Sequence, residues 1–137
     1  MTELPINIKK GQFATCYDMV AAIGKIQEVS KHSLLFITER GTFFGYNDLV
    51  VDMRNITFLK TMTNAYVIVD VTHSLNGSLI LISSIARASI AAGADGIFFE
   101  THPKPLEALS DGKRMVALDN VESLIKDIVK IWNVTRQ

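Results

Sequence analysis

The stretch Ile-Phe-Phe-Glu-Thr-His-Pro, residues 97–103, decides how this chain is expected to fold. Three apolar residues run into a carboxylate, a hydroxyl and an imidazole, and Pro103 ends the run. A short run that is apolar at every position is typical of a strand buried on both faces of a parallel sheet. Polar groups directly after such a strand lie at the carboxyl edge of the sheet, where α/β proteins place their functional sites.

The same pattern occurs three more times upstream, and a segment with helical spacing of its apolar residues follows each run. The predicted strands are residues 5–8, 34–37, 66–69 and 96–99. Strands that alternate with helices predict a parallel sheet with right-handed crossovers. We therefore expect a single domain, residues 1–137, of four β/α units at about 5–31, 33–63, 65–93 and 95–134.

Capping and turn residues set the expected helix ends. Asn47 is expected to cap a helix that begins near Leu49, and Asp119 to cap the last helix. Gly93 is expected to end the helix at residues 79–92. Two architectures fit these elements: a small doubly wound sheet, or half of a (β/α)8 barrel.

The composition is that of a compact globular protein. The 137 residues are 48% hydrophobic and 20% charged, which is typical of a chain that buries a core. Fourteen basic and fourteen acidic residues cancel, so neither nucleic acid nor a membrane surface is an expected partner. No run approaches the roughly 20 apolar residues of a membrane span. With a single cysteine and no signal-peptide pattern, a cytoplasmic location is expected.

Charged and imidazole side chains follow all four predicted strands. Because the carboxyl ends of parallel strands meet at one edge, we expect these side chains to converge. Lysine and arginine together suit a phosphate or a carboxylate. A histidine, a glutamate and Asp111 have the residue types of a divalent-metal site, and they would serve equally in acid–base chemistry. The side chains concerned are Lys9, Lys10, Arg40, Asp70, His73, Glu100 and His102.

Each of these side chains also has a purely structural interpretation. Polar groups after a strand often cap the next helix or contact water. Glu39 and Arg40 fit a surface charge pair, His32 a loop residue, Cys16 a small helix filler and Trp132 a packing residue of the last helix. The coincidence of such groups at four strand ends favours a functional site.

Seven motifs resemble those of the 3-deoxy-D-manno-octulosonate-8-phosphate synthase family, in the family's order and over nearly the whole chain. Two of them, Phe-Gly-Tyr-Asn and Leu-Val-Val-Asp-Met-Arg, favour this family over the related 3-deoxy-heptulosonate-phosphate synthases. The motifs are Asn-Ile-Lys-Lys-Gly-Gln-Phe (7–13), Thr-Glu-Arg-Gly-Thr (38–42), Phe-Gly-Tyr-Asn (44–47), Leu-Val-Val-Asp-Met-Arg (49–54), Asp-Val-Thr-His-Ser (70–74), Glu-Thr-His-Pro (100–103) and Leu-Ser-Asp-Gly (109–112).

The resemblance implies a TIM (β/α)8 barrel that condenses phosphoenolpyruvate with arabinose 5-phosphate and releases phosphate, a step of lipopolysaccharide synthesis. It implies that Lys9 and Arg40 bind the phosphate and carboxylate of phosphoenolpyruvate. His73 and Asp111 match catalytic positions. Asn47 and Asp70 match positions near the substrate.

A divalent metal is implied only if the chain resembles the metal-dependent class of the family. Its ligands in this sequence would be His73, Glu100 and Asp111. The position that separates the two classes lies in a part of the family's barrel that the motifs do not reach. The motifs correspond to strands five to eight, the C-terminal half of the barrel. The Gly- and Ser-rich loop that follows Thr-His-Ser in the family is shorter here, which implies a reduced sugar-phosphate site.

We therefore expect a (β/α)4 half of a barrel with weak or no synthase activity on its own. Four parallel strands leave two open edges and one uncovered face, which would pair with a second copy of the chain or with a separate N-terminal half. A non-catalytic remnant, or a dimerising or partner-binding module, is the alternative. An independent flavodoxin-like domain would need a Gly-rich loop after the first strand, where only Gly11 is found.

Overall fold

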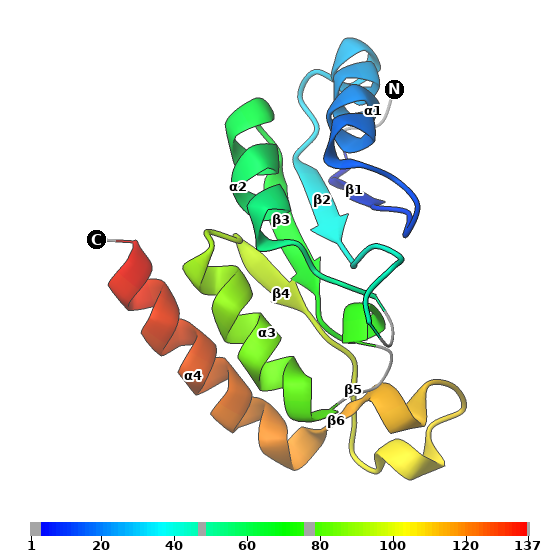
Figure 1. The fold of residues 1–137 in the computed structure, drawn as a ribbon, viewed down its shortest axis with the longest axis vertical. Coiled ribbons are helices and arrows are strands. Elements are labelled where there is room, and N and C mark those ends of the chain that lie inside the picture. Colours follow the sequence, from blue (N-terminus) through cyan, green and yellow to red (C-terminus); the bar gives the residue numbers. More distant parts are fainter. Residues whose placement is uncertain (1–3, 47–48, 76–78, 137) are drawn as a thin grey trace.

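The computed structural model describes residues 4–46, 49–75 and 79–136, and its central element is a parallel sheet. The sheet has four strands in the order β1-β2-β3-β4, each parallel to its neighbour (Figure 1). Its strands are β1 (Ile6–Lys9), β2 (Leu35–Glu39), β3 (Tyr66–Asp70) and β4 (Gly96–Phe98). A sequential order is typical of a barrel, whereas a doubly wound sheet reverses its order at a switch point.

Four α-helices form an arc along one side of this sheet (Figure 1). They are α1 (Cys16–Val29), α2 (Met53–Met62), α3 (Leu79–Ala91) and α4 (Leu118–Thr135). A doubly wound sheet carries helices on both faces, so the predicted (β/α)4 half of a barrel is confirmed over the described residues and the doubly wound alternative is wrong. No helix in the described part of the chain has both the length and the apolar character to cross a membrane.

The core lies between the sheet and the helices. Alternate residues of β2 and β3 face the helices, and Ile37, Val67 and Val69 are fully buried there. Burial of such a side chain stabilises the fold by about 1.5–3 kcal/mol. Their partners from the helices include Met19, Ile23, Ile56, Leu59, Ile82, Ala86 and Ile90.

The opposite face of the sheet, which we term the inner face, is more exposed. Tyr66 is 48% and Phe98 41% exposed on it, and the rings of Phe36 and Tyr66 lie 5.6 Å apart. Partners in parallel register share a face, so the strand pairing identifies its members. They are Asn7, Lys9, Phe36, Thr38, Tyr66, Ile68, Asp70, Gly96 and Phe98.

The start of α2 differs from the prediction. Val50 forms an antiparallel bridge with Thr42, which keeps the chain extended beyond Leu49, and Asp52 caps the helix by accepting the backbone N–H of Arg54 at 3.0 Å. The expected start near Leu49 is therefore wrong. Asn47, the expected cap, lies outside the described residues.

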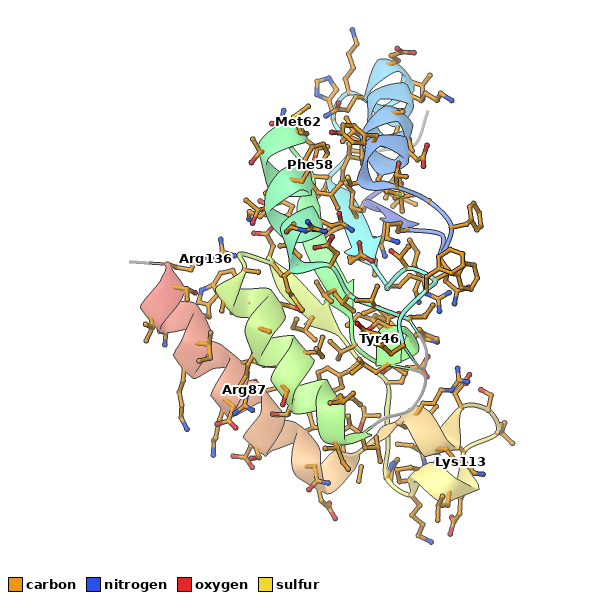
Figure 2. All side chains as sticks on the ribbon, viewed as in Figure 1. Tyr46, Phe58, Met62, Arg87, Lys113 and Arg136 are labelled. Atoms are coloured by element: carbon orange, nitrogen blue, oxygen red, sulfur yellow. The ribbon has the colours of Figure 1, made fainter. Side chains whose placement is uncertain are left out.

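The start of α4 also differs. Its N-cap is Ala117, so Asp119 lies in the first turn and the prediction that it caps the helix is wrong. A small parallel sheet that was not predicted, β5 (Thr101–His102) with β6 (Val116–Ala117), leads into this helix. At the other end of α4, Arg136 donates hydrogen bonds to two carbonyl oxygens in the turn before β4 (Figure 2). Gly93 in that turn has a φ of 104°, as expected of a glycine that ends a helix.

Candidate active site at the carboxyl edge of the sheet

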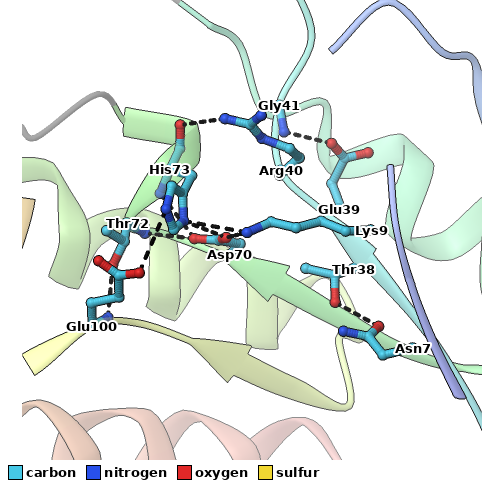
Figure 3. A network of polar contacts seen from close by, with 10 residues as sticks. All are labelled: Asn7, Lys9, Thr38, Glu39, Arg40, Gly41, Asp70, Thr72, His73 and Glu100. Atoms are coloured by element: carbon cyan, nitrogen blue, oxygen red, sulfur yellow. Dashed lines mark hydrogen bonds and ion pairs between the residues drawn. The ribbon is translucent and has the colours of Figure 1, made fainter. Parts of the chain in front are cut away.

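Polar side chains from the ends of several strands meet at the carboxyl edge of the inner face (Figure 3). Lys9 ends β1 and Asp70 ends β3. The Lys9 Nζ lies 2.5 Å from the Asp70 Oδ2, although β2 separates the two strands. Neighbouring strands lie about 4.8 Å apart, so the long Lys9 side chain can cross β2 to reach Asp70, and the curl of a barrel sheet shortens this distance. The predicted convergence of these strand ends is therefore found.

Asp70 is the buried centre of this cluster. Its Oδ1 accepts the backbone N–H groups of Thr72 at 3.0 Å and His73 at 2.9 Å. Its Oδ2 receives the Lys9 ammonium and the His73 Nδ1, the latter at 2.8 Å. Bonds of this kind to a charged acceptor are stronger than neutral ones, so the carboxylate is held in one orientation.

The ring of His73, the first residue of η1 (His73–Leu75), is oriented by Asp70. In the tautomer whose Nδ1–H donates to the Asp70 carboxylate, Nε2 carries a free lone pair. That Nε2 faces Glu100, whose Oε1 lies 3.6 Å away (Figure 3). A histidine backed by a carboxylate in this way is the usual arrangement of metal-binding histidines.

His73, Glu100 and Asp111 form a group that can hold a metal ion. One ligand atom from each lies within 4.8 Å of the others. The Glu100 Oε2 is buried and lacks a hydrogen-bond partner among the described residues, and such an orphaned oxygen fits a bound cation. One imidazole and two carboxylates are ligands that divalent transition metals accept. The residue types and their geometry therefore fit a divalent metal.

Arg40, directly after β2, contributes the second cation. Its Nη2 donates to the backbone oxygen of His73 at 3.4 Å, whereas its Nε is buried without a partner among the described residues. Buried donors without an acceptor are rare. Lys9 contacts Asp70 and Arg40 contacts the backbone of His73, so the two cations provide positive charge beside the proposed metal ligand His73, an arrangement that can hold an anion near a metal.

Two expectations for this region are wrong. The Lys10 side chain is fully buried on the other face, where it pairs with Glu39 at 3.3 Å, because successive strand residues point to opposite faces. Glu39 is accordingly no surface partner of Arg40. His102 contacts the backbone of Lys104 through Nδ1, so its recorded partners lie in the loop after β5.

Two residues of the site were missed by the sequence analysis. Thr72 accepts the backbone N–H of Glu100 at 2.9 Å and so links the ends of β3 and β4. Ser74 is fully buried, and its Oγ has no partner among the described residues. The only signal for either was a hydroxyl residue on each side of His73.

Comparison with known proteins gives a consistent result. A model of the DAHP synthetase I family matches residues 1–136. The 2-dehydro-3-deoxyphosphooctonate aldolase of Desulfotalea psychrophila is 43% identical, and the match covers 93% of this chain and 48% of that protein. The protein of the same name from Vesicomyosocius okutanii is 38% identical over 98% of this chain and 51% of its own length. The chain thus spans about half the length of the curated relatives it matches.

The fold has a solved counterpart. The crystal structure of phospho-2-dehydro-3-deoxyheptonate aldolase (DAHP synthase) from Thermotoga maritima superposes with a TM-score of 0.86 at 28% identity. The match covers 95% of this chain and 38% of that one. The predicted resemblance to octulosonate-phosphate synthases is confirmed by the names of the curated relatives.

Proposed function

Because this chain belongs to the DAHP synthetase I family, we propose that it forms the phosphoenolpyruvate and metal side of an octulosonate-phosphate synthase active site. The observation that carries the proposal is the run of contacts from Lys9 through Asp70 and His73 to Glu100. The identity of 38–43% to proteins named 2-dehydro-3-deoxyphosphooctonate aldolase supports the choice of substrate.

The proposed reaction joins phosphoenolpyruvate to arabinose 5-phosphate. C3 of phosphoenolpyruvate attacks the aldehyde of arabinose 5-phosphate, water adds at C2 of phosphoenolpyruvate, and inorganic phosphate leaves. Lys9 and Arg40 hold the phosphate and carboxylate of phosphoenolpyruvate, since an ammonium and a guanidinium match these groups by charge and by shape. Asn47 and Asp70 are proposed to lie near the bound substrate. Fixing the reactants in this way lowers the barrier by positioning and by electrostatic stabilisation.

His73, Glu100 and Asp111 are proposed to hold a divalent metal. When bound, such an ion polarises an oxygen and lowers the pKa of water. His73 and Asp111 are also the proposed catalytic residues, and they orient the attacking water beside the anion. Asp70 keeps the His73 ring turned so that Nε2 faces the proposed metal position beside Glu100, through the 2.8 Å contact with Nδ1.

Titration calorimetry of the purified chain with phosphoenolpyruvate tests the proposal. We expect binding that Mn²⁺ strengthens and that Arg40→Met abolishes. Arg87→Met is the matched control, because Arg87 is exposed on α3. Absence of binding by the unchanged chain would contradict the proposal.

A second assay addresses turnover. Phosphate release that depends on arabinose 5-phosphate is expected to be weak or absent, because the curated relatives use about twice this length of chain. Release at a normal enzyme rate, roughly 1–10³ s⁻¹, would show instead that this chain alone is a competent synthase.

A second candidate function is a dimerising or partner-binding module. Tyr66 and Phe98 expose large apolar surfaces on the inner face, and each outer strand of the described sheet has only one neighbour. Open edges and exposed apolar faces favour association. The proposed occupant is a second copy or a separate half-barrel. A folded monomer in sedimentation velocity at high micromolar concentration would exclude pairing between copies.

A further inference from the structure

Behind the site, on the helix side of the sheet, lies a buried ion pair that the proposed reaction does not use. The Lys10 Nζ and the Glu39 Oε1 lie 3.3 Å apart, and both side chains are fully buried. Removing two charges from water is costly, and a buried pair often adds little net stability. The pair therefore calls for an explanation other than stability.

Both members of the pair form hydrogen bonds with the backbone of Gly41, the residue that follows Arg40. Glu39 accepts the backbone N–H of Gly41 at 2.7 Å, and Lys10 donates to the Gly41 carbonyl oxygen at 2.9 Å. Gly41 has a φ of 85°, a conformation that other residues rarely adopt. Asn55 of α2 donates to the other oxygen of Glu39 at 3.2 Å. The turn after β2 is thus held by two charged groups that are anchored from both sides.

Arg40 lies between Glu39, a member of this pair, and Gly41, whose backbone both members of the pair contact. Its guanidinium is oriented across the inner face toward His73, where Nη2 donates to the backbone oxygen and Nε stays buried and unpaired. We propose that Lys10 and Glu39 are positioning residues, which hold the Arg40 backbone so that Nε is aimed at the anionic substrate. The proposal rests on the proposed function of Arg40 in binding phosphoenolpyruvate. Groups fixed in advance bind without paying to become ordered.

The double variant Lys10→Met/Glu39→Gln tests the inference, because it removes both charges and nearly keeps the shapes. The NMR signal of the Arg40 Nε–H group, assigned by its loss in Arg40→Lys, is expected to move to the averaged position of exposed arginines. The Kd for phosphoenolpyruvate is expected to rise about tenfold, the value of one hydrogen bond to a charged group. The single variant Asn55→Ala, which removes only the donor to the second oxygen of Glu39 and leaves both charges in place, serves if the double variant does not fold, with a weaker expected effect in the same direction.

A matched control is the ion pair between Lys60 and Asp95, which lie 2.5 Å apart at the start of β4. Lys60→Met/Asp95→Asn is expected to lower the melting temperature and to leave the Arg40 signal unchanged. An unchanged Arg40 signal in the Lys10/Glu39 or Asn55 variant, or unchanged phosphoenolpyruvate affinity where the parent binds, would overturn the inference. If the signal moves and the parent does not bind phosphoenolpyruvate, the positioning role stands and the proposed function of the site fails.

Discussion

Asp70 accepts hydrogen bonds from both the ring and the backbone of His73. One carboxylate thus fixes both the position and the orientation of this proposed metal ligand. In Asp70→Asn, one acceptor oxygen is replaced by an NH2 donor, so the side chain can no longer accept both the His73 ring N–H and the backbone N–H groups of Thr72 and His73. We expect the affinity for Mn²⁺ to fall about 10- to 100-fold, as measured by titration calorimetry. Asp95→Asn is the control, because this carboxylate pairs with Lys60 instead. Equal losses in the two variants would contradict a specific role for Asp70.

Arg40 tests whether the shape of the cation matters as much as its charge. Arg40→Lys keeps a positive charge but loses the planar fork that matches a carboxylate or phosphate. We expect the Kd for phosphoenolpyruvate to rise about tenfold, the value of one hydrogen bond to a charged group. Lys9→Arg is the complementary change, because it keeps the positive charge and replaces an ammonium group with a planar guanidinium. An Arg40→Lys variant that binds as tightly as the parent would show that charge alone is used.

At the scale of elements, the N-cap of α2 links stability to pH. The hydrogen bond from the Arg54 side chain holds the pKa of Asp52 below its ordinary value. A carboxyl group with a lowered folded pKa stabilises the fold above its unfolded pKa of about 4, and this contribution is lost as the pH falls through the folded pKa. We expect Asp52→Ala to lower the free energy of unfolding by about 1 kcal/mol at pH 7. Urea unfolding should show the difference shrinking below pH 4, and a constant difference at pH 3 would refute this account.

The elements also show what the sequence could predict. Apolar runs identified all four main strands, because each run is long enough to fill the buried face of the sheet. The N-terminal end of α2 was mispredicted, since the bridge between Thr42 and Val50 pairs two parts of the connection from β2 to α2, and local patterns do not encode this pairing. For the same reason β5 and β6, which have two residues each, were missed. In the site, polar types after strands found His73 and Glu100, but only the sheet geometry shows that Lys10 turns away.

The whole molecule presents one face that its own helices do not cover over the described residues. If copies pair through this inner face, a charge on it should separate them, because burying an unpaired charge is strongly unfavourable. We expect Tyr66→Glu to shift the sedimentation coefficient toward that of a monomer. Val134→Glu is the control, because Val134 is also an exposed hydrophobic residue but lies on α4, away from the inner face. A monomeric parent, or the same shift in both variants, would exclude the inner face as the contact.

The reach of Lys9 across β2 to Asp70 has a thermodynamic consequence. One carboxylate oxygen is shared between a cation proposed to bind an anion and a histidine proposed to bind a metal. An anion that draws Lys9 away leaves Asp70 to interact more strongly with the His73 ring, which increases the ring's donor strength toward a metal. Linkage is reciprocal, so the metal must then strengthen anion binding by the same factor. Cooperativity between the two proposed ligands is therefore expected to pass through this single shared oxygen atom.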